Sequence, residues 1–121
     1  MYYINDYINF DLVWNTGIGF GLLSSASPFI YNVITLIIGI VILILFYFLL
    51  VSEIIDKIIL AIIIGGASGN FYDRFAYNAV PDFIDLHYKG FHWFTFNVAD
   101  IFISCGILLY ILRSFFIESK Q

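Results

Sequence analysis

The run from Phe29 to Val51 contains no charged residue and constrains the fold more than any other part of the chain. About 20 consecutive apolar residues are enough for an α-helix to cross the hydrocarbon core of a bilayer, so this run predicts a transmembrane helix. The composition agrees, because 62% of the residues are hydrophobic and only 12% are charged, against about 25% charged residues in soluble domains. We therefore predict an all-α integral membrane protein.

Two further apolar stretches predict two more transmembrane helices. The turn SEIIDK after Val51 is too short for a domain, so it must join antiparallel neighbours. Gly65 and Gly69 lie four residues apart and offer a small-residue face that permits close helix packing. The prediction is one membrane domain, residues 1–121, with transmembrane helices at 29–51, 54–72 and 96–116.

The remaining two segments are predicted to lie outside the hydrocarbon core. In residues 1–28, apolar Ile8, Phe10, Leu12 and Trp14 alternate with mostly polar neighbours, which is typical of a short half-buried strand at the interface. Residues 73–95 contain Pro81, which prevents a continuous helix, and are expected to form an extracytoplasmic active-site loop.

The orientation in the membrane follows from the few basic residues. The predicted helices place three basic residues on one side of the membrane, namely Lys57, Arg113 and Lys120. They place two on the other side, Arg74 and Lys89. Because cytoplasmic loops carry an excess of Lys and Arg, the Lys57 side is predicted to be cytoplasmic. The acidic segment then faces outward.

Composition also excludes several classes of function. A formal net charge of -4 leaves no basic patch to neutralise phosphates, so nucleic acid is not an expected partner. Cys105 is the only cysteine, which excludes an internal disulfide. His87 and His92 flank a predicted turn at Lys89 and Gly90, unlike a helical His-x-x-x-His zinc pair. We therefore interpret them as interfacial polar residues and expect neither a metal nor a cofactor.

Acidic side chains at the ends of apolar segments suggest a chemical role, because charged groups near a bilayer are costly. Asp82 lies within the predicted loop and Asp100 lies in the first turns of the helix that follows it, so the two could meet if the chain folds back. A carboxylate pair can hydrolyse a peptide bond when one member takes a proton from water and the other donates a proton to the carbonyl oxygen. Asp85 is an equally good candidate on these grounds, so the residues alone leave the choice open.

Four ordered motifs resemble those of the bacterial lipoprotein signal peptidases, the signal peptidase II family. The motifs are WNTGIGFGLLS, GGASGNFYDR, VPDFID and FNVAD. The resemblance implies a multi-pass aspartyl endopeptidase of the bacterial cytoplasmic (inner) membrane, with its active site on the extracytoplasmic side. Its partners would be membrane lipid and diacylglyceryl-modified prolipoproteins, cleaved on the N-terminal side of the lipidated cysteine.

The same resemblance assigns roles to individual residues. It implies that Asp82 and Asp100 form the catalytic pair, which favours Asp82 over Asp85. It also implies a small extracytoplasmic β-element near the N-terminus. The positions implied to bind substrate or to support the catalytic pair are Asn15, Asn70, Arg74 and Asn97.

The chain departs from the family pattern in two respects. Family members have four transmembrane helices, and this sequence starts just after the place where the first of them would end. Pro81 stands where the family usually has a second valine. Two alternatives therefore accompany the peptidase hypothesis: an inactive truncated remnant of the enzyme, or a non-catalytic membrane subunit in which Asp73, Asp82 and Asp100 relay protons or cations.

Overall fold

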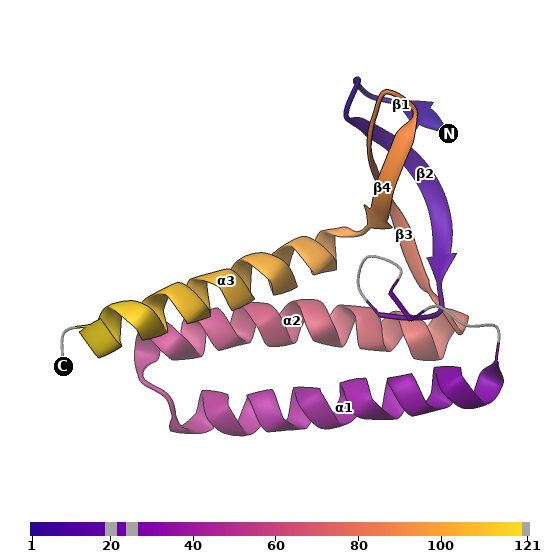
Figure 1. The fold of residues 1–121 in the computed structure, drawn as a ribbon. Coiled ribbons are helices and arrows are strands. Elements are labelled where there is room, and N and C mark those ends of the chain that lie inside the picture. The colour runs from indigo at the N-terminus through magenta and orange to yellow at the C-terminus, as the bar shows by residue number, and fades with distance from the viewer. Residues whose placement is uncertain (19–21, 24–26, 120–121) are drawn as a thin grey trace.

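The computed structural model describes residues 1–18, 22–23 and 27–119. Three helices run side by side, and a small sheet stands at one end of them (Figure 1). The helices are α1 (Pro28–Val51), α2 (Ile54–Tyr77) and α3 (Val98–Ser119). Each is long and apolar enough to cross a membrane, which confirms the predicted three-helix architecture. Lys120, used in the charge count, lies outside the described residues.

The helix ends differ from the predicted ones because hydropathy locates the apolar span and not the end of the helix. α2 continues beyond residue 72 to Tyr77, where Asn78 ends it in a left-handed conformation with φ 58°. α3 starts at Val98, since Phe96 still belongs to a strand. The segment 73–95, expected to be a loop, is therefore the end of α2 followed by two strands.

The sheet is antiparallel with strand order β1-β2-β3-β4. It consists of β1 (Tyr2–Tyr3), β2 (Ile8–Asn15), β3 (Val80–Tyr88) and β4 (Phe91–Phe96). Register shifts interrupt the pairing of β2 with β3 and of β3 with β4. Because β3 follows α2 and β4 leads into α3, this hairpin joins the two helices at their shared end (Figure 1).

The strand predicted from alternation is present, but its buried face is the polar one. In β2, Asn9 and Asn15 are each only 4% exposed, whereas Leu12 is 57% exposed and Trp14 is 50% exposed. The physical reason is the surroundings: apolar side chains next to a bilayer lose nothing by facing outward, while polar side chains must find partners inside the protein.

The helices pack through α2, which contacts both α1 and α3. A buried cluster of Ile59, Leu60 and Ile63 on α2 packs against residues of both neighbours. Close approach of α2 and α3 depends on Gly66 and Gly106. A Cβ atom at Gly66 would lie 2.8 Å from the Ala99 carbonyl oxygen, and one at Gly106 would lie 2.5 Å from Ile63 Cγ1.

Gly65 and Gly69 do not serve as the predicted packing face, since a Cβ atom at either would meet nothing within 4 Å. We expect Gly66→Ala to lower the free energy of unfolding by about 1–3 kcal/mol, because the new methyl group forces α2 and α3 apart. The matched control Gly65→Ala should be neutral or stabilising. Unfolding of the detergent-solubilised protein by SDS measures both, and equal effects of the two variants would contradict the assigned packing.

Candidate active site

The start of α3 holds Asp100 in a reciprocal pair of hydrogen bonds with Asn97. The Asn97 backbone N–H donates to Asp100 Oδ2 at 3.0 Å, and the Asp100 backbone N–H donates to Asn97 Oδ1 at 3.1 Å. This is the geometry of a capping box, in which two residues three apart satisfy each other's backbone donors at a helix N-terminus. The cap fixes both the helix start and the direction of the Asp100 carboxyl group.

The side-chain amide of Asn97 links this helix start to two other elements. Its Nδ2 donates to Asp82 Oδ1 at 2.9 Å and to Asn70 Oδ1 at 3.0 Å. Asn70, on α2, in turn donates from Nδ2 to Asp100 Oδ1 at 3.1 Å. Asn97 therefore contacts both carboxyl groups. Asn70 hydrogen-bonds to both Asn97 and Asp100 and so helps to hold them in place.

Asn15 completes the ring of amide donors from the end of β2. Its Nδ2 donates to Asp82 Oδ2 at 3.1 Å, and its Oδ1 accepts a hydrogen bond from the Gly17 backbone N–H at 2.7 Å. Asn15 faces Val80 in the β2–β3 register, so pairing of these strands brings it beside Asp82. Both oxygens of Asp82 thus have an asparagine donor.

Asp82 and Asp100 are buried, with exposed fractions of 1% and 4%. Burial, and after it the nearby negative charge of Asp100, raise the pKa of Asp82 from its ordinary value to about 6, although the amides of Asn15 and Asn97 oppose the shift. A carboxyl group with a pKa in this range can gain and lose a proton near neutral pH, as acid–base chemistry requires.

Arg74 lies next to this site without contacting either carboxyl group through any hydrogen bond in the described chain. The residue as a whole is 2% exposed. Its guanidinium donates to Thr35 Oγ1 at 2.9 Å and to the Gly17 carbonyl at 2.5 Å, and its Cζ lies 4.6 Å from the centre of the Tyr31 ring. It therefore ties α1 to the segment that follows β2 and supports the position of Asn15.

The two carboxyl groups open onto an apolar cavity of about 370 Å³. Its walls come from all three helices, including Val41 on α1, Ala67 on α2 and Ile107 on α3. Since α1 and α3 pack mainly on α2 and not on each other, the cavity lies in the trough between them. It suits an apolar group presented to the carboxyl pair from the membrane.

Two acids considered from the sequence lie elsewhere. Asp85 accepts a contact from His92 at 2.7 Å, and neither Asp85 nor Asp73 lines the cavity. Conversely, sequence reasoning overlooked Tyr31 and Thr35. Their spacing of four residues places both on one face of α1, and a polar pair within an otherwise apolar run was the available signal.

We expect Asn97→Ala to lower the free energy of unfolding by about 0.5–2 kcal/mol, because α3 loses its N-cap. Asp82 would also lose the side-chain amide donor of residue 97, whereas Asp100 would keep its backbone N–H donor. Activity that depends on the position of Asp82 should therefore fall even if the variant remains folded. Thermal unfolding together with an activity assay measures the two effects. Asn32→Ala, at an exposed position of α1, is the control and should change neither.

The fold and the site define a class of multi-pass bacterial membrane enzymes. Two solved structures of bacterial membrane enzymes, at 2.3 and 1.9 Å resolution, match the chain with TM-scores of 0.75 and 0.70 and sequence identities of 28% and 29%. The matches cover 98% and 93% of this chain and 72% of each solved chain.

The sequence comparisons identify the family. The family model for signal peptidase (SPase) II matches residues 1–116, and this chain belongs to that family. It is 51% identical over 119 residues to a lipoprotein signal peptidase of Pelagibacter ubique, covering 98% of this chain and 72% of the relative. A lipoprotein signal peptidase of Francisella tularensis subsp. novicida is 39% identical over 122 residues, covering 98% of this chain and 76% of the relative.

Proposed function

We propose that this protein is an aspartyl endopeptidase that removes signal peptides from diacylglyceryl-modified prolipoproteins, with Asp82 and Asp100 as the catalytic pair. Cleavage would occur on the N-terminal side of the lipidated cysteine. The observation that carries the proposal is that Asn97 hydrogen-bonds to both buried aspartates where they meet the apolar cavity. Asn15 and Asn70 would support the pair, and Arg74 would support Asn15.

The mechanism uses one proton shared by the pair, since two neighbouring carboxyl groups do not both ionise readily. The ionised member takes a proton from a water molecule whose oxygen attacks the scissile carbonyl carbon. The protonated member donates its proton to the carbonyl oxygen. The member that took the water proton then donates it to the amide nitrogen, and the other member takes a proton back from a hydroxyl of the tetrahedral intermediate. The C–N bond breaks, and the signal peptide leaves as a carboxylic acid and the lipidated cysteine as an amine.

The apolar trough between α1 and α3 favours the hypothesis that the substrate reaches the site from within the membrane. A diacylglyceryl group dissolved in lipid can move laterally, and the apolar walls next to the aspartates offer it a place to lie. This arrangement also favours hydrolysis over the alternative carboxylate relay. Relay acids should form a chain inside the bundle, whereas Asp73 does not line the cavity that Asp82 and Asp100 share.

The proposed orientation places the sheet and the site on the extracytoplasmic side of the bacterial inner membrane. The opposite end of the helices carries Lys57 in the first turn of α2 and Arg113 of α3, which pairs with Asp56 at 2.8 Å. Basic residues near that end fit a cytoplasmic location.

The test uses the full chain in lipid nanodiscs with a prolipoprotein in two forms, with and without the diacylglyceryl group. We expect cleavage of the lipidated form only, with the new N-terminus at the modified cysteine. Equal cleavage of both forms would remove lipid recognition from the proposal. If the protein cleaves neither form but carries protons across a liposome membrane, the relay hypothesis would replace the hydrolase hypothesis.

The rate should depend on pH with an acid limb near pH 6. Below that value Asp82 holds a proton and cannot serve as the base that activates water. Stability should change with pH in the opposite direction to the rate. The pKa of Asp82 is higher in the folded chain than in the unfolded one. Its contribution to stability is therefore present at acid pH and is lost as the pH rises through about 6. A pH profile of kcat/KM, with unfolding of wild type and Asp82→Asn at pH 4.5 and 7.5, checks both signs.

A further inference from the structure

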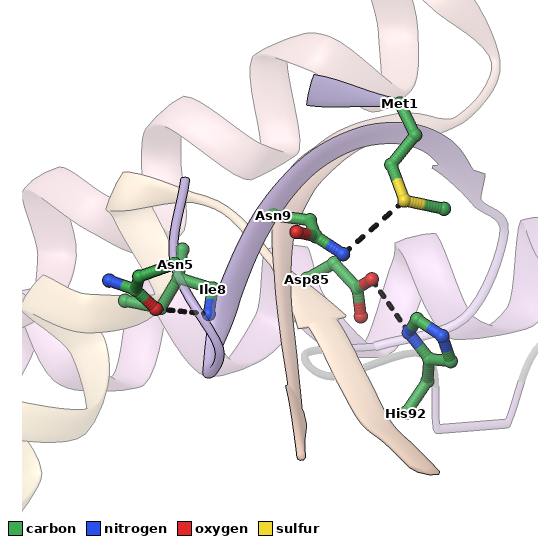
Figure 2. A network of polar contacts seen from close by, with 6 residues as sticks. All are labelled: Met1, Asn5, Ile8, Asn9, Asp85 and His92. Atoms are coloured by element: carbon green, nitrogen blue, oxygen red, sulfur yellow. Dashed lines mark hydrogen bonds and ion pairs between the residues drawn. The ribbon is translucent and has the colours of Figure 1, made fainter. Parts of the chain in front are cut away.

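A second polar cluster lies in the sheet, apart from the aspartate pair. Figure 2 shows Asn9 of β2 beside Asp85 of β3, and His92 of β4 in contact with Asp85. The Asp85 Oδ2 to His92 Nδ1 distance is 2.7 Å. His87 of β3 faces His92 across the β3–β4 register. Asn9, Asp85 and His87 are all buried, with exposed fractions of 4%, 3% and 8%.

Two atoms of this cluster have unmet hydrogen-bonding capacity. Within the described residues, Asn9 Oδ1 and His87 Nε2 are buried and have no hydrogen-bond partner. Burying a polar atom without a partner is unfavourable, because its hydrogen bonds to water are lost and not replaced. The free nitrogen of His87 lies next to a second histidine ring, so one bound ligand could contact both side chains.

The two imidazole rings have the separation of a metal-chelating pair. Their centroids are 5.3 Å apart with an interplanar angle of 35°. When two imidazoles bind one tetrahedral zinc ion with nitrogen-to-metal distances of about 2.1 Å, their centroids lie roughly 5 Å apart. The sequence had argued against such a site because the histidines do not share a helix, but pairing of β3 with β4 brings them together.

Asp85 supplies the group that metal-bound histidines usually have behind them. A histidine that binds a metal almost always donates its other ring N–H to a carboxylate, a carbonyl or water, which orients the ring. Asp85 occupies this position at His92 Nδ1, so His92 would bind a metal through Nε2. The buried carboxylate also offsets part of the positive charge of the ion.

We infer that His87 and His92 form a binding site for a zinc-class divalent metal ion, with Asp85 as the outer partner that orients His92. Within the described residues no group of three or more His, Cys, Asp or Glu side chains is arranged to hold a metal. The ion would therefore have two protein ligands and complete its coordination with water. It would join β3 to β4 near the tip of the hairpin that connects α2 to α3.

Metal titration of the untagged full chain in detergent tests the site, since these are its only two histidines. We expect one equivalent of Zn²⁺ by calorimetry, and tetrahedral visible bands when Co²⁺ replaces it. His87→Gln and His92→Gln should abolish both signals. Asp85→Asn should weaken affinity by about 10–100-fold. Zn²⁺ should raise the Tm of the wild type and leave that of His87→Gln unchanged.

The controls address other donors and the fold. Cys105→Ala removes the only thiol and should bind like the wild type, and excess Mg²⁺ should not compete, because imidazole nitrogen favours zinc-class ions. His92 is half exposed, so His92→Gln tests the site even if His87→Gln fails to fold. Less than one fifth of an equivalent bound by the wild type, or undiminished binding in the His92→Gln variant, would overturn the proposal. Prolipoprotein cleavage plays no part in these measurements, so their outcome is independent of the proposed activity.

Discussion

Replacing either Asp82 or Asp100 with asparagine is expected to reduce kcat/KM for a lipidated prolipoprotein by at least about 100-fold. General acid–base catalysis contributes about 10²–10⁴ to a rate, and an amide can neither take the proton from water nor donate one to the carbonyl oxygen. Asparagine keeps the size of the side chain and part of its hydrogen bonding, so both variants should remain folded.

The measurement compares initial cleavage rates in nanodiscs, with thermal unfolding of each variant as the check on folding. Asp73→Asn and Asp85→Asn are matched controls, since each removes one carboxylate outside the cavity. Both should retain activity within a few fold of the wild type. Cleavage at the wild-type rate by a folded Asp82→Asn or Asp100→Asn protein would remove that residue from the catalytic pair.

Replacing Arg74 with methionine is expected to lower the free energy of unfolding by about 2–4 kcal/mol, because buried acceptors lose a charged donor. The Gly17 carbonyl and Thr35 Oγ1 both accept from this guanidinium. Gly17 also donates to Asn15 Oδ1, so the loss should loosen the contact of Asn15 with Asp82. We therefore expect kcat to fall as well.

Two further variants separate the parts of this effect. Arg74→Lys keeps the charge but loses the planar fork that reaches two acceptors together, so it should restore only part of the stability. Thr35→Val removes one acceptor and should cost about 1 kcal/mol. A stable Arg74→Met protein with a raised KM and an unchanged kcat would contradict the supporting role and assign Arg74 to substrate binding.

Local signals in the sequence predicted much of the fold. The uncharged run before Val51 identified α1, and alternation identified β2, because both patterns repeat over a few residues. The alternation did not say which face is buried, and the structure shows that the buried side chains of β2 are the polar Asn9 and Asn15. Helix ends were also missed: a left-handed Asn78 and the Asn97–Asp100 cap are features of backbone geometry that hydropathy does not contain.

The candidate site was only partly accessible from the sequence. The residues near the aspartates were named from the motif resemblance, and no spacing argument could have joined Asn15 to Asp82, because β2 and β3 are separated by two membrane helices. Arg74 was expected near the pair, but its contacts with Tyr31 and Thr35 depend on how α1 packs against α2. The sequence predicted that His87 and His92 are interfacial polar residues, and only strand pairing shows that they lie opposite each other.

The sequence by itself determined that this protein crosses a membrane and that it shares the motifs of signal peptidase II, because hydrophobicity and residue order belong to the chain before it folds. The tertiary structure decided which polar groups meet: two aspartates joined by one asparagine, and a histidine pair backed by a third acid. The physical reason is that these contacts depend on how the elements pack and pair, both for residues far apart along the chain, such as Asn15 and Asp82, and for the nearby His87 and His92. Helix packing and strand register set such distances, and in an apolar environment each buried polar group must find its partner there.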